Sequence, residues 1–286
     1  MINPLKRVEV NRYILRHPGV DHRTEGMRIA HVTDVHLGRW IKPRHVEALA
    51  VYVNASAPDL TVLTGDYVGY RRRDIAPCVA SLGMLEGPVF ATLGNHDHWA
   101  CTRTTLGAFE RHAIPVLSNR SVQMTTVRGH SLQVIGVDDA VTRNHDIERA
   151  FGEVDADGFR LVLCHVPELG PRVAQAGGHL ILSGHTHGLQ FNIPRVTEPI
   201  AARFGMKYIQ GAYALDEACM LYVSRGLGSA SWPWRIRASP ELSFFELAAG
   251  PRVSLSLHER TTIELAPSPR RQRKLRRALE AGEATE

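Results

Sequence analysis

Short apolar runs rich in β-branched residues recur along the chain, and this pattern predicts buried strands. Several of these runs end at Gly, Asp or His, where a strand gives way to a loop. The predicted strands cover residues 28–34, 60–66, 89–95, 132–139, 160–166, 179–185, 219–226 and 242–248.

Helical periodicity lies between several of these runs. It is clearest at residues 42–56, where Val46, Leu49 and Val53 share one face and Pro43 suits a first turn. Weaker helices are predicted at residues 73–85, 103–113, 147–151 and 167–177, and after residue 211 the pattern is strand and loop. Strands that alternate with helices favour one α/β domain with buried sheets over a two-domain enzyme.

We expect this domain to span residues 1–266 and a basic, flexible tail to follow at 267–286. The tail from residue 268 holds six basic and three acidic residues, so it carries +3 of the net charge of +5. It is interpreted either as a contact for anionic lipid or nucleic acid, or as a solvated, frayed end. The small remaining charge indicates no specific nucleic-acid partner for the folded body.

The composition is that of a soluble protein with an ordinary core. No apolar run approaches the roughly 18 residues of a membrane-spanning helix, and charges interrupt the N-terminal segment, which therefore has no signal-peptide pattern. The four cysteines are far apart and form no CxxC pair, which predicts free thiols. We therefore expect a cytoplasmic protein, with peripheral membrane contact left open.

Side chains that bind metals follow five of the predicted strands. The carboxyl ends of strands are where open α/β sheets place their sites, and alternation sends Asp34 and His36 to one side of the chain, as it does His185 and His187. The set is Asp34, His36, Asp66, Asn95, His165, His185 and His187.

Two divalent metal ions explain this set better than one. Taken singly, a histidine after a strand is usually a satisfied buried polar group. Together, two carboxylates, four imidazoles and one amide exceed the positions of a single ion, whereas two ions with a bridging carboxylate use them all. Nitrogen and oxygen ligands without thiolate suit Mn, Fe, Zn or Co, with Mn favoured. Two ions roughly 4 Å apart can clamp the attacking and leaving oxygens of a displacement at phosphorus.

In this order the motifs DVH, GD, GNHD, H and GHTHG resemble the signature of the calcineurin-like binuclear metallophosphoesterases. They span residues 34–188, and LYVSRGLG and PELSFFEL resemble the last strands of that family. The resemblance implies a metallophosphoesterase fold, in which two packed mixed β-sheets are flanked by α-helices in an αββα sandwich. It also implies a metal-dependent phosphoric ester hydrolase that uses a metal-bridging hydroxide.

The resemblance assigns roles residue by residue. It implies that Asp34, His36 and His187 hold the first metal, that Asn95, His165 and His185 hold the second, and that Asp66 bridges them. It places His96 beside the leaving group, as a proton donor or a stabiliser of phosphoryl charge. Asp97 either orients His96 or only caps the helix that follows.

The substrate is less well specified. Arg71, Arg72 and Arg73 follow the GD motif and form either a phosphate contact or a solvated helix start. His98 and Trp99 follow GNHD and are candidates to line the pocket. The subgroup that the chain most resembles has SGHTHGGQ, with glycine where this chain has Leu189, and it includes bacterial phosphodiesterases, some of which act on UDP-diacylglucosamine.

A second aromatic and basic stretch bears on the partner. Trp232 and Trp234 stand beside Arg235 and Arg237, which suits either a lipid headgroup or membrane surface, or core packing. These features favour a phosphodiesterase or pyrophosphatase that acts on a small-molecule, nucleotide or lipid-linked phosphoester, such as UDP-diacylglucosamine. The alternatives are a phosphomonoesterase, including a protein phosphatase, on the same site, and a non-catalytic interaction module.

Overall fold

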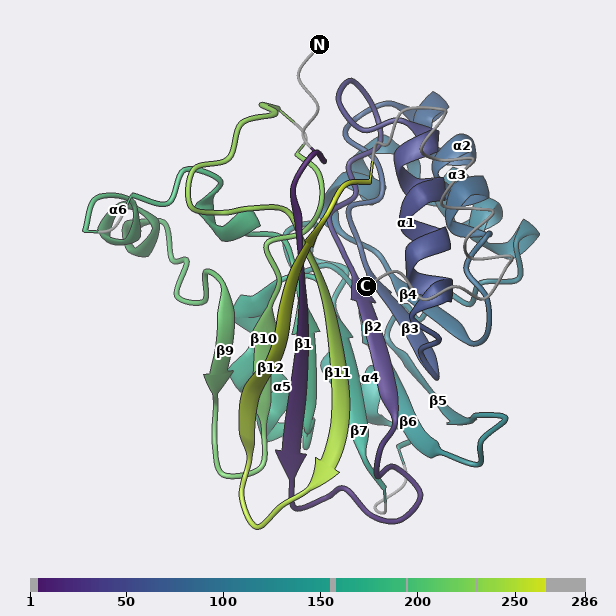
Figure 1. Ribbon diagram of the computed structural model, residues 1–286, viewed down its shortest axis with the longest axis vertical. Helices are drawn as coiled ribbons and strands as arrows, with labels where there is room; N and C mark the ends of the chain where they lie inside the picture. The colour runs from purple at the N-terminus through teal and green to yellow at the C-terminus, as the bar shows by residue number, and fades with distance from the viewer. Residues whose placement is uncertain (1–4, 155–157, 194, 230, 266–286) are drawn as a thin grey trace.

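Two six-stranded β-sheets pack face to face in the computed structural model (Figure 1), which describes residues 5–154, 158–193, 195–229 and 231–265. The tail predicted at 267–286 lies outside the described residues. The first sheet has the order β12-β1-β11-β2-β3-β4 and the second the order β5-β6-β7-β8-β10-β9. The strands of the first sheet are β1 (Val8–His17), β2 (Arg28–Val32), β3 (Leu60–Thr64), β4 (Val89–Thr92), β11 (Glu241–Ala249) and β12 (Ser254–Ile263). Those of the second are β5 (Arg120–Thr125), β6 (Ser131–Val137), β7 (Arg160–Cys164), β8 (Leu180–Ser183), β9 (Gly211–Ala214) and β10 (Met220–Val223).

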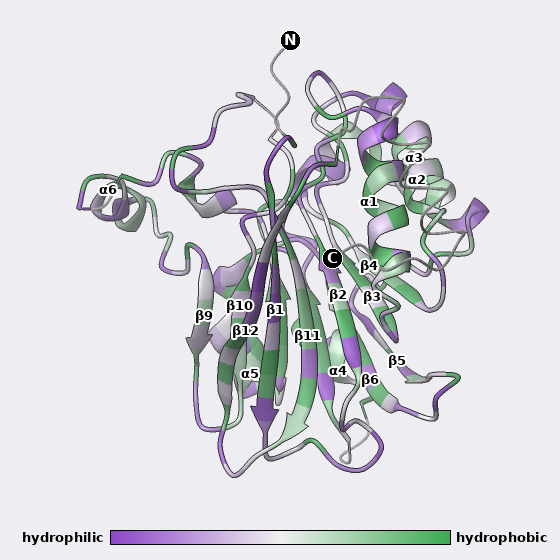
Figure 2. Cartoon of the chain, in the orientation of Figure 1, coloured by the Kyte–Doolittle hydropathy of each residue, from purple (hydrophilic) through white to green (hydrophobic). Residues whose placement is uncertain are grey.

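Helices cover the outer faces of both sheets. Helices α1 (Pro43–Ala55), α2 (Ile75–Leu82) and α3 (Asn95–Arg111) pack on the first sheet, and α4 (Ile147–Phe151) and α5 (Gly170–Gln175) pack on the second. A third apolar cluster fills the space between the sheets, where Ile29 and Val62 of the first sheet pack with Leu161 and Leu182 of the second. Hydrophobic residues run along β2, β3 and α1 in Figure 2. The αββα sandwich expected from the sequence is confirmed.

The strand directions bring the carboxyl ends of distant segments to one edge. β2, β3 and β4 are parallel to one another, and β6, β7, β8 and β10 are parallel in the second sheet. A polar residue that follows any of these strands therefore emerges at an edge shared with its neighbours. This geometry gathers residues that lie far apart in the sequence.

Several elements differ from the sequence-based expectation. The eight predicted strands are β2, β3, β4, β6, β7, β8, β10 and β11, but β1, β5, β9, β12 and a short helix, α6 (Thr197–Arg203), were not expected. Helix α3 begins at Asn95 rather than at residue 103. A helical segment that the sequence pattern did not predict precedes Cys101, whose extended backbone interrupts the helix. The 3₁₀ turns Arg72–Asp74, Pro167–Leu169 and His187–Leu189 complete the described elements.

All four cysteines are free thiols, as expected. Among the described residues, no helix has the length and apolar character needed to cross a bilayer.

Candidate metal centre

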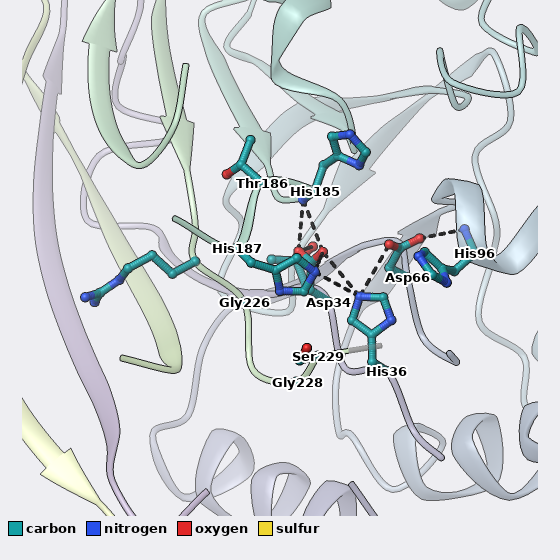
Figure 3. Close-up of polar contacts among 12 residues, drawn as sticks. Asp34, His36, Asp66, His96, His185, Thr186, His187, Gly226, Gly228 and Ser229 are labelled. Atoms are coloured by element: carbon teal, nitrogen blue, oxygen red, sulfur yellow. Dashed lines mark hydrogen bonds and ion pairs between the residues drawn. The ribbon is translucent and has the colours of Figure 1, made fainter. Parts of the chain in front are cut away.

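Three residues of the candidate centre leave the first sheet at neighbouring strand ends. Asp34 and His36 follow β2, and Asp66 follows β3. All three have left-handed backbone conformations, with φ of 52°, 47° and 56°. Non-glycine residues adopt this conformation at a cost that the surrounding structure must bear, and such residues concentrate at functional sites. The strained exits turn the three side chains toward one another (Figure 3).

The second sheet supplies the histidines. His165 follows β7, and His185 and His187 follow β8, the latter two also with positive φ. His187 meets the first-sheet residues, because its Nε2 lies 3.3 Å from Asp34 Oδ1 and 3.0 Å from His36 Nε2. His36 Nε2 also lies 3.4 Å from Asp66 Oδ2. Two imidazole nitrogens and two carboxylate oxygens thus converge on one small volume, which is the donor arrangement that a divalent ion takes.

A second group of donors adjoins the first. His165 Nδ1 lies 2.7 Å from the carbonyl oxygen of Thr64. Because a carbonyl can only accept, Nδ1 carries a proton, and Nε2 faces Asp66 Oδ2 at 3.4 Å. Burial opposes protonation of His165, but Asp66 outweighs it and raises the pKa of this ring to about 10, so a bound cation would replace the proton on Nε2. The side-chain oxygen of Asn95 and the Nε2 of His165 are both buried and have no hydrogen-bond partner among the described residues. Such unpartnered buried atoms fit metal ligands, so the residues present suit a second ion beside the first.

His185 lies beside this second group, but its ring nitrogens are not among the donor atoms that the structure brings together. Its ring lies 5.1 Å from the ring of His165 and extends away from the Asp34, His36 and His187 side chains in Figure 3. Its backbone N–H donates to both carboxylate oxygens of Asp34 at 3.1 Å. The backbone at His185 therefore holds the carboxylate of Asp34 in place.

The electrostatics favour anionic carboxylates. Burial opposes the ionisation of Asp34, but the imidazoles of His187, His36 and His165 outweigh it and hold the pKa of Asp34 well below its ordinary value. Burial also opposes the ionisation of Asp66, yet His165 and His36 lower its pKa. Burial lowers the pKa of His187 to about 3, which leaves this ring neutral. Two buried carboxylates that stay negative at the end of the sheets form a field that attracts cations.

Glycines allow the chain to pass close behind the carboxylates. A Cβ atom at Gly184 would clash with Asp34 Oδ2, and one at Gly226 would clash with Asp34 Cβ. Gly226 also has a φ of +63°. Only glycine fits at these two positions without displacing Asp34.

His96 stands at the edge of the centre. Its Nδ1–H donates to the carbonyl oxygen of Gly69, and its backbone N–H donates to Asp66 Oδ1 at 2.9 Å. A ring nitrogen of His96 lies within 4.8 Å of donor atoms of His36 and Asp66. The aromatic rings of Tyr70 and Trp99 lie 4.6 and 5.0 Å from the His96 ring. Tyr70 was not expected from the sequence, although this residue is close to Asp66 along the chain.

Comparison with known proteins identifies the family. Residues 27–189, more than half of the chain, match the family described as calcineurin-like phosphoesterase. The chain belongs to this family. The calcineurin-like phosphoesterases are dimetal-dependent phosphoric ester hydrolases, and this phosphoesterase brings the donor atoms of Asp34, His36, Asp66, His165 and His187 into adjoining groups.

Two curated relatives are similar over most of their length. The uncharacterized metallophosphoesterase YkuE of Bacillus subtilis is 26% identical over 246 residues, which cover 84% of this chain and 85% of that protein. Phosphodiesterase YaeI of Escherichia coli is 29% identical over 231 residues, which cover 77% of this chain and 82% of that protein. Among solved structures, a 5'-nucleotidase precursor from Thermus thermophilus has a TM-score of 0.51 at 14% identity, with 90% of this chain and 58% of that chain covered, and supports the fold alone.

The contacts of Asp97 agree with the second of its two predicted roles, a cap at the start of α3, and its role toward His96 stays a prediction. The Asp97 carboxylate is fully buried and accepts hydrogen bonds from the backbone N–H groups of Asp66 at 2.8 Å, Tyr67 at 3.0 Å and Gly94 at 3.0 Å. Burial, and then Asp66, raise the pKa of Asp97 to about 7. The carboxylate therefore fixes the loop that carries Asp66, and the His96 ring is held by Gly69.

The ring of His98 is fixed by two side chains, and its place in the pocket lining stays a prediction. Its Nε2 lies 2.7 Å from Asp138 Oδ1, and its Nδ1 lies 3.0 Å from the Thr102 hydroxyl, so both ring nitrogens are engaged. Burial opposes protonation of His98, but Asp138 outweighs it and raises the pKa. His98 thus joins α3 to the end of β6.

The three predicted phosphate contacts, Arg71, Arg72 and Arg73, are exposed at the turn that precedes α2. Their role stays a prediction. Trp99 is exposed and packs against His96, which agrees with a place beside the substrate.

Arg235 is a further contact of the centre. Its Nη2 lies 3.2 Å from His187 Nδ1, and its Nη1 donates to the carbonyl oxygens of Arg225 at 2.6 Å and Ala238 at 3.1 Å. The sequence singled out this arginine only for its tryptophan neighbours. No local signal links it to His187, which is 48 positions away.

Proposed function

We propose that this phosphoesterase is a two-metal phosphodiesterase or pyrophosphatase. The observation that carries the proposal is the pair of buried, unpartnered donor atoms, Asn95 Oδ1 and His165 Nε2, next to the carboxylate of Asp66. A merely structural cluster would satisfy these atoms, because an unpaired buried polar atom costs about 1–3 kcal/mol. The preference for diesters is supported by the similarity to a relative named phosphodiesterase.

Each ligand has a proposed place. Asp34, His36 and His187 hold one ion, Asn95, His165 and His185 hold the other, and Asp66 lies between them. Oxygen and imidazole nitrogen donors suit manganese, iron, zinc or cobalt, and of these we favour manganese. Two bound ions would neutralise phosphoryl charge and lower the pKa of a water molecule that attacks phosphorus.

The surrounding side chains orient and protonate the substrate. Gly69 accepts the Nδ1–H of His96, so the Nε2 of this ring is the atom available to act on the leaving group. A displaced alkoxide is a poor leaving group, and protonation by a positioned histidine assists its departure. Tyr70 and Trp99 flank His96 and offer aromatic surface to the leaving-group side of the substrate. This wall suits a nucleotide or lipid-linked diester, of which UDP-diacylglucosamine is one example.

The test compares bis-p-nitrophenyl phosphate with p-nitrophenyl phosphate in the presence of manganese. We expect faster turnover of the diester and two metal ions per chain by elemental analysis.

Asn95→Ala should abolish hydrolysis while circular dichroism stays unchanged. His96→Ala should keep both ions and lower kcat by about 10²–10⁴-fold, most for poor leaving groups. The control is His258→Ala, an exposed histidine on β12.

Three results would overturn the assignment. Faster hydrolysis of the monoester would make the protein a phosphomonoesterase, and no turnover of either substrate with metal bound would make it an interaction module. Loss of metal from the His96→Ala variant would show that His96 is a ligand.

A further inference from the structure

Large apolar side chains are exposed on two segments beside the metal centre. Eight of the fifteen exposed large hydrophobic residues in the described chain fall in residues 191–204 and 232–236. Trp232 is 59% exposed, Trp234 51% and Phe204 80%. We call this surface the apolar rim, and it consists of Phe191, Ile193, Val196, Ile200, Phe204, Trp232, Trp234 and Ile236.

The two segments of the apolar rim are joined by backbone hydrogen bonds. Phe191 and Ile236 form an isolated parallel β-bridge. The N–H of Asn192 donates to the carbonyl oxygen of Ile236 at 2.9 Å, and the N–H of Ile236 donates to that of Gln190 at 2.8 Å. The carbonyl oxygen of Ile193 accepts hydrogen bonds from the N–H groups of Val196 and Thr197, where α6 begins, and Figure 1 draws α6 at the left, outside both sheets. Backbone hydrogen bonds therefore connect the two segments of the rim, whereas exposed apolar residues scattered singly would be ordinary on any surface.

This unit is attached to the metal centre at two points. Gln190 directly follows the His187–Leu189 turn, and its Nε2 donates to the carbonyl oxygens of Trp232 at 2.7 Å and Trp234 at 3.0 Å. Arg235, between Trp234 and Ile236, contacts His187 Nδ1 at 3.2 Å. Whatever covers the apolar rim is thus held next to the candidate metal ligands.

The chemistry of the rim fits an anionic lipid surface. The rings of Trp232 and Trp234 stack with centroids 5.8 Å apart, and tryptophan is the side chain enriched at the boundary between lipid and water. Residues 191–207 and 231–237 contain five basic residues against the single acid Glu198. Arg235 faces His187, and the other four, Arg195, Arg203, Lys207 and Arg237, are exposed among the apolar residues. Basic residues near a bilayer are attracted to anionic headgroups, and a short amphipathic segment lies on the bilayer rather than crossing it.

We propose that the apolar rim docks this protein on the surface of an anionic phospholipid bilayer. Docking would place the metal centre against phosphoesters that are held in the bilayer, and this second consequence rests on the proposed phosphodiesterase function. The docking itself does not depend on catalysis.

The experiment is sedimentation of the full-length protein with sucrose-loaded vesicles. We expect it to pellet with vesicles of phosphatidylcholine and phosphatidylglycerol, and more weakly with phosphatidylcholine alone. The double variant W232S/W234S and, independently, the α6 double variant I200S/F204S should each lower the partition coefficient at least about tenfold. The matched control V127S changes a fully exposed valine in the turn between β5 and β6, which Figure 1 draws at the lower right, and should bind like the wild type.

Clear outcomes would overturn the docking proposal. The wild type could stay in the supernatant with anionic vesicles, or V127S could lose binding as much as the rim variants. Light scattering could instead show that the rim variants dissociate an oligomer without changing vesicle binding, which would assign the rim to contacts between copies of the chain. Hydrolysis of bis-p-nitrophenyl phosphate, measured in parallel without vesicles, reports on the proposed function separately, so failure of one proposal is distinguishable from failure of the other.

Discussion

A methyl group at Gly226 should disable the metal centre without changing a ligand. The added Cβ would lie far inside the 3.4 Å at which ordinary contact with Asp34 Cβ begins, so Asp34 or the glycine loop must move by about 1 Å. Metal–ligand distances tolerate only about 0.2 Å. Because Asp34 faces both His36 and His187, a displacement of this size breaks the geometry of the first group.

The free-energy cost of a positive φ at Gly226 can be separated from the effect of the steric contact with Asp34. Gly226 has a φ of +63°, and an L-residue there costs about 1–2 kcal/mol. Gly205 has a φ of +80° with nothing within 4 Å of the position that an added methyl group would take, so Gly205→Ala incurs the same backbone cost and no contact. The difference between the two variants therefore measures the displacement of Asp34.

The assays are manganese affinity by calorimetry, kcat/KM on bis-p-nitrophenyl phosphate, and unfolding in urea. Gly226→Ala should lower metal affinity about 10–100-fold and kcat/KM about 100-fold. Gly205→Ala should keep both and lose only about 1–2 kcal/mol of unfolding free energy. Full metal affinity and activity in Gly226→Ala would refute the proposed role of Asp34 at this centre.

Two further predictions concern stability. Glu241 is buried and accepts a hydrogen bond from Arg225 Nε at 2.7 Å, so Glu241→Ala should cost about 3–5 kcal/mol in urea unfolding by leaving a buried charge short of its partner. The partly exposed Glu9, which also pairs with Arg225, is the control and should cost about 1 kcal/mol or less; equal losses would contradict this. Burial lowers the pKa of His31 from 6.5 to about 4, so the unfolded chain binds a proton that the folded chain does not, and up to about 3 kcal/mol of stability is lost as the pH falls from 6.5 to 4. His31→Gln should flatten this pH profile, and an unchanged slope would show that other groups cause it.

The strand pattern was largely readable from the sequence, because eight of the twelve strands are short apolar runs. β1 was missed because Glu9, Arg12 and Arg16 interrupt its apolar residues. The sheet tolerates these charges because β1 pairs with the exposed strand β12, where Glu259 lies 3.2 Å from Arg12. A propensity-based prediction cannot foresee such a partner from a distant part of the chain.

The candidate ligands were predictable for a different reason. They follow parallel strands, so topology alone gathers them at one edge. The support around them was not predictable: the Asp97 hydrogen bonds to the loop of Asp66, the Asp138 contact of His98 and the Arg235 contact of His187 each depend on side-chain placement in the folded chain. Sequence spacing carries no signal for contacts of this kind.

The proposed ligands are divided between the layers of the sandwich, with Asp34, Asp66 and Asn95 on one sheet and His165 and His185 on the other. Cations bound by these residues would cross-link the two sheets at one end of the protein. Metal binding is then coupled to folding, because an ion present at about 100 times its Kd raises the free energy of unfolding by about 2.7 kcal/mol. Removal of the metal ions would consequently weaken the packing between the two sheets as well as abolish hydrolysis.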